Sequence, residues 1–189
     1  VKTIGYSGEP LKIESALAAV KQRFYEIQIL EKITTVRSLQ IKTCGLEVRQ
    51  ERVKSQSNTK MDDVTSFVYD VMQANHLGWI FGDLNYKNVI FDGVRFRIID
   101  FEPFTKVKRE SQIQYRVTPP YFHPLDKANK HVSCLTDRLG LIGLYLRIRL
   151  GLRKQKEIFS LHADGLHGLA LKEGESFVKN LKDLGEKYA

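Results

Sequence analysis

The stretch that decides the fold runs from residue 81 to 102 and reads FGDLNYKNVIFDGVRFRIIDFE. It contains Asp83, Asn88 and Asp100, with two short apolar runs between the last two of these residues. An Asp-Gly dipeptide joins the two runs, which is typical of a tight β-hairpin over residues 89–99. Such a hairpin would bring Asn88 and Asp100 together at its open end, with Asp83 on the loop before it.

Two carboxylates and an amide arranged in this way suit phosphoryl transfer. The reaction needs a carboxylate near the incoming hydroxyl and oxygen ligands that hold Mg²⁺ against the phosphates. Mg²⁺ usually takes only one or two ligands from carboxylates, so Asn88 and Asp100 are sufficient as its protein ligands. Asp83, five residues before Asn88, can then face the group that accepts the phosphate.

This stretch resembles the protein-kinase-like superfamily. The pattern from Asp83 to Asn88 is similar to the catalytic loop D-L-x-x-x-N, and Asp100 begins a D-F-E that is similar to D-F-G. The resemblance implies that Asp83 is the catalytic base and that Asn88 and Asp100 bind Mg²⁺ or Mn²⁺ beside ATP. It also implies that Lys87 reaches the phosphoryl group during transfer.

Two downstream segments extend the resemblance. Residues 118–124, TPPYFHP, resemble the end of a kinase activation segment, which assigns Thr118 to that segment. The run TDRLGLIG resembles the start of the next kinase helix, whose Asp hydrogen-bonds the backbone of the catalytic loop, and Asp137 is its counterpart. An ordinary helix N-cap is the other interpretation of Asp137.

An upstream segment resembles the kinase helix whose Glu pairs with a strand Lys. It reads FYEIQIL over residues 24–30 and makes Glu26 the candidate; a solvated helix face is the other interpretation of this residue. Lys2, in the strand-like VKTI, is the first choice for the ATP-binding lysine, and Lys12 is the second.

The sequence also departs from the kinase pattern. No G-x-G-x-x-G precedes Lys2, so either the natural protein continues upstream or the phosphates are covered without that loop. Phe81-Gly82 replaces the usual His-Arg before Asp83, which removes the common partner of a phosphorylated activation loop. Three functions therefore stay open: a protein kinase, a small-molecule kinase of the aminoglycoside or choline type, and a pseudokinase that acts as a binding module.

Periodicity extends the fold prediction to the rest of the chain. Apolar stripes at helical spacing predict four helices, and alternating β-branched residues predict one more hairpin at 36–53. We expect an α+β, two-lobed, minimal kinase-like fold with a small β-rich N-lobe (1–54), a polar hinge (55–60) and a mostly α C-lobe (61–189). The predicted helices are Glu14–Ile33, Met61–Leu77, Leu135–Leu150 and Phe177–Tyr188.

Charge and composition narrow the choice of partner. The net charge of the 189-residue chain is +8, which favours anionic partners, and the basic run at 106–109 could hold an acidic stretch of substrate. The favoured function is an ATP- and Mg²⁺-dependent protein Ser/Thr kinase with an acidic protein substrate, and nucleic acid is not expected as a partner.

No apolar run reaches the roughly 20 residues that span a bilayer. The expected location is the cytoplasm, or a host cytoplasm if the chain is a secreted effector; the substrate and the oligomeric state stay open.

Overall fold

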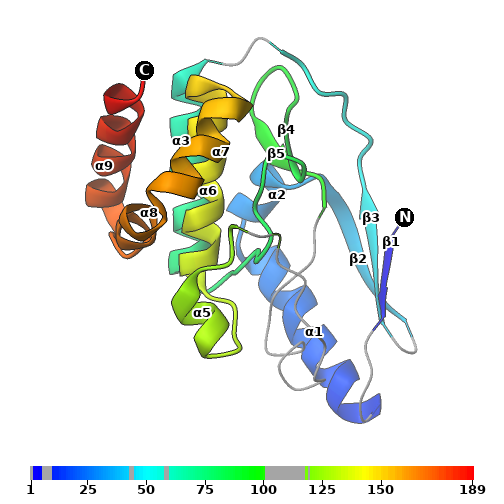
Figure 1. The fold of residues 1–189 in the computed structure, drawn as a ribbon. Helices are drawn as coiled ribbons and strands as arrows, with labels where there is room; N and C mark the ends of the chain where they lie inside the picture. The colour runs from blue at the N-terminus through cyan, green and yellow to red at the C-terminus, as the bar shows by residue number, and fades with distance from the viewer. Residues whose placement is uncertain (1, 6–9, 43–44, 58–59, 101–117, 119) are drawn as a thin grey trace.

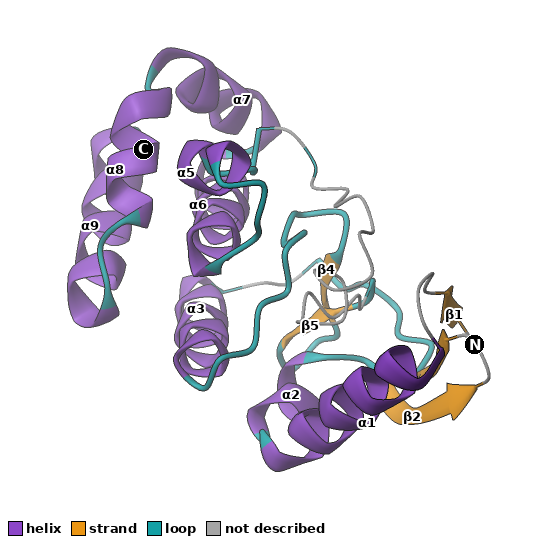
Figure 2. Cartoon of the chain, turned by 90° about the horizontal axis from the view of Figure 1, so that it is seen from below, coloured by secondary structure: helices purple, strands orange, loops and turns teal. Residues whose placement is uncertain are grey.

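The computed structural model describes residues 2–5, 10–42, 45–57, 60–100, 118 and 120–189. A three-stranded antiparallel sheet and a long helix lie on one side, a group of helices lies on the other, and a two-stranded hairpin lies between them (Figures 1 and 2). The expected α+β class is therefore confirmed.

The N-terminal part consists of the sheet and the helix that covers it. Helix α1 packs against the sheet through a stripe that includes Leu17, Val20 and Phe24, and the hydroxyl of Tyr25 accepts a hydrogen bond from the Leu39 amide (3.2 Å). The sheet order is β1-β3-β2, so the first strand pairs with the third. The elements are β1 (Lys2–Gly5), α1 (Pro10–Glu26), α2 (Ile29–Ile33), β2 (Val36–Lys42) and β3 (Gly45–Gln50).

The helix predicted over 14–33 is in fact two helices. It begins earlier, at Pro10, because a first-turn residue needs no N–H for an intrahelical bond. The break between α1 and α2 leaves Ile27 and Leu30 both buried, so the apolar stripe continues across it. For this reason, periodicity alone could not locate the break.

The C-terminal part is built around α6, which is buried from Thr136 to Leu146. Helices α3, α7, α8 and α9 pack against it. Its N-cap is Ser133, whose Oγ accepts a hydrogen bond from the Leu135 amide (3.2 Å). The elements are α3 (Met61–His76), β4 (Val89–Phe91), β5 (Phe96–Ile98), α5 (Pro124–Ala128), α6 (Cys134–Leu150), α7 (Leu152–Leu161), α8 (Ala163–Ala170) and α9 (Gly174–Lys187).

A buried arginine on the β4–β5 hairpin connects the two parts. The Arg97 guanidinium donates to the carbonyl of Thr34 (Nη2–O, 2.7 Å) and to the Glu51 carboxylate (3.1 Å). Residues 55–57 of the predicted hinge are exposed, but the Gln56 backbone amide donates to the Phe91 carbonyl (2.8 Å). One hydrophobic core includes buried residues from both parts.

In the ranges that the structure describes, no helix combines the length and apolar character needed to cross a bilayer.

Candidate active site

The loop between α3 and β4 is anchored by a buried carboxylate on α6. Asp137 has no exposed surface, and its oxygens accept hydrogen bonds from the backbone amides of Phe81 (2.9 Å) and Gly82 (2.7 Å). The Asn75 side chain donates a third (2.8 Å). This is the contact that the kinase resemblance implies for Asp137, and the capping role belongs to Ser133 instead.

Burial and hydrogen bonding act in opposite directions on this carboxyl group. Burial raises the pKa of Asp137 to about 7, whereas the donors from Phe81, Gly82 and Asn75 lower it. The raised pKa means that desolvation of the charged form outweighs the stabilisation that the three donors give it.

Two glycines bring α6 close to the loops. A Cβ at Gly140 would lie 1.9 Å from the Leu84 carbonyl oxygen, and a Cβ at Gly143 would lie 2.3 Å from the Tyr121 ring. A glycine inside a helix can either allow close packing or merely weaken the helix. These distances indicate close packing of α6 against Leu84 and Tyr121, because a side chain at either position would overlap them.

Asp83 is the central carboxylate of the loop. Its Oδ2 accepts a hydrogen bond from the Asn88 side-chain amide (2.9 Å), and its Oδ1 accepts from the backbone amide of Thr118 (3.0 Å). The Asn85 amide also donates to Oδ1 (3.1 Å). Donors from three residues therefore fix the orientation of this carboxylate.

The β4–β5 hairpin places Asn88 opposite the end of β5. The Ile99 amide donates to the Asn88 carbonyl (2.9 Å), and Val89 pairs with Ile98, so Asp100 follows directly at the open end of the hairpin. Since the Asn88 amide nitrogen is bonded to Asp83, its side-chain oxygen is the atom left for a cation. Among the described residues, no group of three or more His, Cys, Asp or Glu side chains could hold a metal ion. An amide oxygen and a carboxylate fit Mg²⁺, which takes its remaining ligands from water and phosphates.

Other predicted site residues lie further from this centre, or their side chains are not described. Glu26 ends α1 and is exposed; its carboxylate accepts from Gln22 of the same helix (2.8 Å) and pairs with Arg23 (3.3 Å). The backbone of Lys2 lies on β1, but the side chains of Lys2 and Lys12 are outside the described residues. The Lys2–Glu26 pair therefore stays a prediction. Phe101, Glu102 and the basic run 106–109 also lie outside the described residues.

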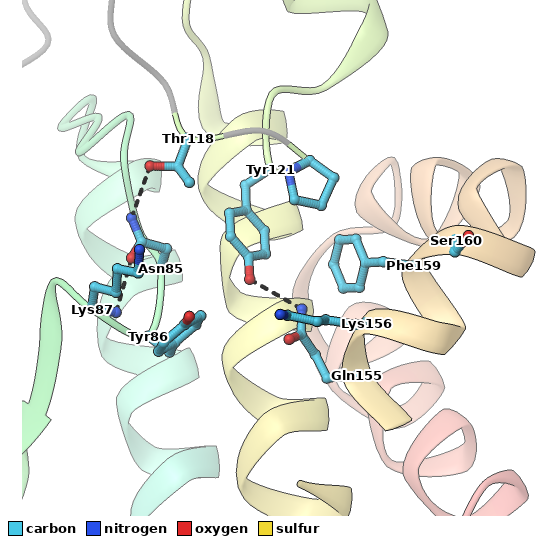
Figure 3. A pocket seen from close by; sticks show the side chains of 10 residues that line it. Asn85, Tyr86, Lys87, Thr118, Tyr121, Gln155, Lys156, Phe159 and Ser160 are labelled. Carbon is cyan, nitrogen blue, oxygen red and sulfur yellow. Dashed lines mark hydrogen bonds between the residues drawn. The ribbon is translucent and has the colours of Figure 1, made fainter. Parts of the chain in front are cut away.

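A pocket of about 430 Å³ opens beside the loop (Figure 3). It lies between the loop, the segment at Thr118 and helix α7, and exposed Lys87 lies on its wall. Its lining residues are Asn85, Tyr86, Lys87, Thr118, Pro120, Tyr121, Gln155, Lys156, Phe159 and Ser160.

Sequence reasoning missed the wall that α7 contributes. No kinase-like motif follows Gly151, so nothing there matched a known pattern. The spacing of Gln155, Ile158 and Phe159, all buried, indicates one face of a helix and could have revealed the element. Its position beside the Asp83 loop comes only from the packing of α7 against α6.

Comparison of the chain with protein-family models and with curated proteins finds no match. The assignment of a function therefore depends on the geometry of this site and on the motifs that it contains.

Proposed function

We propose that this chain is an ATP- and divalent-cation-dependent phosphotransferase with a minimal, two-lobed, protein-kinase-like fold. The observation that carries the proposal is the bond between Asn88 and Asp83 (2.9 Å) at the open end of the hairpin that leads to Asp100. The side-chain NH₂ group of Asn88 orients Asp83, the candidate base. The side-chain oxygen of Asn88 is then left for a cation. The anchor from buried Asp137 supports the same interpretation, because it holds the loop rigidly.

In the proposed reaction, Asp83 orients the acceptor hydroxyl and takes its proton. The hydroxyl oxygen forms a bond to the γ-phosphorus of ATP, and the bond from that phosphorus to the β–γ bridging oxygen breaks, which releases ADP. Asn88 and Asp100 would hold the Mg²⁺ or Mn²⁺ ion, which supplies charge neutralisation at the phosphates. Lys87 would stabilise the phosphoryl group in transit, while Lys2 and Glu26 would complete the ATP site.

A protein Ser or Thr hydroxyl is the first candidate for the acceptor. The Thr118 amide bonded to Asp83 supports this choice, since a peptide laid along that segment would pass the candidate base. A small-molecule acceptor is the second candidate, and the pocket beside the loop favours it. The proposed location is the cytoplasm.

The test is phosphoryl transfer by purified protein with Mg²⁺ or Mn²⁺ and γ-labelled ATP, in the presence of cell lysate. We expect Asp83→Ala and Asp100→Ala each to lower transfer by about a thousandfold, since each removes a group that acts on the transition state. Arg153→Ala, an exposed residue of α7 outside the pocket lining, is the control and should keep wild-type activity.

Circular dichroism must show that the variants stay folded. Wild-type turnover by folded Asp100→Ala would contradict the proposal. Binding of ATP without any transfer would favour the pseudokinase interpretation.

A further inference from the structure

The pocket beside the loop is connected directly to the candidate base. Asn85 and Thr118 both line the pocket, and both donate hydrogen bonds to Oδ1 of Asp83 (3.1 and 3.0 Å). A molecule in the pocket therefore lies one residue away from that carboxylate. The volume of about 430 Å³ is within the range of small-molecule sites.

The charges around the pocket favour an anion. Lys87 and Lys156 line it and are exposed at its rim, and no carboxylate occurs among its described lining residues. The guanidinium of Arg147 stacks on the ring of Tyr86, 3.9 Å from the ring centroid, and adds a third positive charge beside the pocket. Such a field attracts a phosphate or carboxylate and repels the ammonium groups of aminoglycosides and choline.

The floor of the pocket carries a buried side-chain acceptor that is available to a ligand hydroxyl. Gln155 is 2% exposed, and its Nε2 donates to the hydroxyl of Tyr121 (3.0 Å). Its Oε1 is buried and has no hydrogen-bond partner within the described part of the chain. A buried acceptor without a partner is unfavourable, and a ligand hydroxyl would satisfy it.

Aromatic side chains complete the site. Figure 3 shows Tyr86, Tyr121 and Phe159 around the same space as Gln155 and Lys156. Burial raises the pKa of Tyr121, which keeps its hydroxyl protonated at neutral pH. The rings offer apolar faces that suit the C–H face of a sugar, whereas the amide and phenol groups suit its hydroxyls.

We propose that the second candidate, a small-molecule acceptor, binds in this pocket, and that it is a polyol that already carries an anionic group, such as a sugar phosphate or a sugar acid. The inference deepens the proposed function and rests on it for the transfer step alone. Lys156 holds the anion at the rim, Gln155 accepts from a hydroxyl at the floor, and another hydroxyl is directed past Asn85 and Thr118 toward Asp83. That hydroxyl loses its proton to Asp83 as its oxygen bonds to the γ-phosphorus and ADP leaves.

Calorimetric titration without nucleotide or metal separates binding from transfer. The probes are glucose 6-phosphate, ribose 5-phosphate and glucuronate, with glucose, glucosamine and a phosphoserine peptide for comparison. We expect at least one anionic sugar to bind about tenfold or more tightly than glucose and glucosamine. Equal or tighter binding of the uncharged or cationic sugars, or no binding of any sugar, would overturn the inference. A phosphoserine peptide that binds more tightly than every sugar would overturn it in favour of a peptide acceptor.

Matched variants on one helix then locate the site. Lys156→Glu should weaken the anionic sugar by about tenfold or more, whereas Arg153→Glu, the same charge change at an exposed position outside the lining, should change it less than about twofold. Gln155→Met should weaken the sugar phosphate but leave the binding of inorganic phosphate unchanged. If the two charge reversals weakened sugar binding equally, the anion would be attracted by the general positive charge of the protein and would not be held in this pocket.

The outcomes for the two proposals differ. If the anionic sugar binds in the pocket but no transfer follows with ATP, the pocket inference stands and the phosphotransferase proposal fails. If Asp83-dependent transfer occurs to proteins alone, the phosphotransferase proposal stands and the pocket inference fails.

Discussion

At the scale of single residues, the loop geometry depends in part on Asp137, a residue outside the loop. Its carboxylate accepts from two consecutive backbone amides, at Phe81 and Gly82, and from the Asn75 side chain. Gly82 has a φ of +81°, a conformation that L side chains rarely adopt. The loop is thus held from outside by a helix that begins some fifty residues later in the chain.

The raised pKa of Asp137 predicts a specific dependence of stability on pH. The pKa of about 7 means that the folded state holds a proton on this group up to that pH, whereas the unfolded state releases it near the ordinary aspartate pKa of 3.8. Between these values the folded state binds more protons, so the free energy of unfolding contributed by this group falls as pH rises. Asp137→Asn does not titrate and should cost about 1–3 kcal/mol, because one amide donor would then face the Asn side-chain NH₂.

Urea denaturation of both proteins at several pH values between about 4 and 8 tests this prediction. The stability advantage of wild type over Asp137→Asn should shrink as pH rises through this range. A constant difference would show that Asp137 is ionised throughout and that the three donors outweigh burial.

At the scale of elements, the close approach of α6 to the loops shapes the site. Gly140 lies against the Leu84 carbonyl and Gly143 against the ring of Tyr121, so one helix positions both the Asp83 loop and the segment that follows Thr118. The hydrogen bond from Gln155 to Tyr121 attaches α7 to the same segment (3.0 Å).

Gly140→Ala should therefore damage the protein despite its better helix propensity. Its Cβ would overlap the Leu84 carbonyl oxygen, a backbone atom, and such overpacking costs about 1–3 kcal/mol. Gly168→Ala in α8 is the matched control: a Cβ there meets nothing within 4 Å, so the exchange should stabilise by up to about 1 kcal/mol. Chemical denaturation measures both values, and a Gly140→Ala protein as stable as wild type would show that the loop can move away.

At the scale of the whole molecule, the two parts share one core. Arg97 on the hairpin bonds to Thr34 and Glu51 of the N-terminal part, and Thr34 forms a parallel bridge with Ile98. The ring of Trp79, in the loop after α3, packs against Phe24 of α1 with centroids 5.8 Å apart. These contacts make separate unfolding of the parts costly, because each part would expose buried polar groups and apolar surface.

We therefore predict a single cooperative unfolding transition. Fluorescence of Trp79, the one tryptophan of the chain, reports on the contact between the parts, and far-ultraviolet circular dichroism reports mainly on the helices. The two midpoints in urea should coincide. A fluorescence transition that precedes the loss of helix would show that the N-terminal part separates first.

The sequence by itself determined the elements with strong local patterns and the order of the chemical groups. Apolar periodicity located α3, α6 and the β4–β5 hairpin to within about two residues at each end, because these patterns are local and strong. The same short stretch predicted that Asn88 and the start of the segment at Asp100 lie together, because the pairing of a hairpin determines which residues meet at its open end. Asp83 lies on the loop that leads into this hairpin.

Only the tertiary structure decided the contacts between distant segments. The sequence could not choose between an anchoring and a capping role for Asp137, because both fit a helix start, and only the position of α6 against the loop distinguishes them. It gave no sign that Gln155 lies beside the Asp83 loop, because no local pattern encodes the packing of α7 on α6. The pocket and its charge depend on residues up to about 75 positions apart in the chain, and such contacts form only when the core packs.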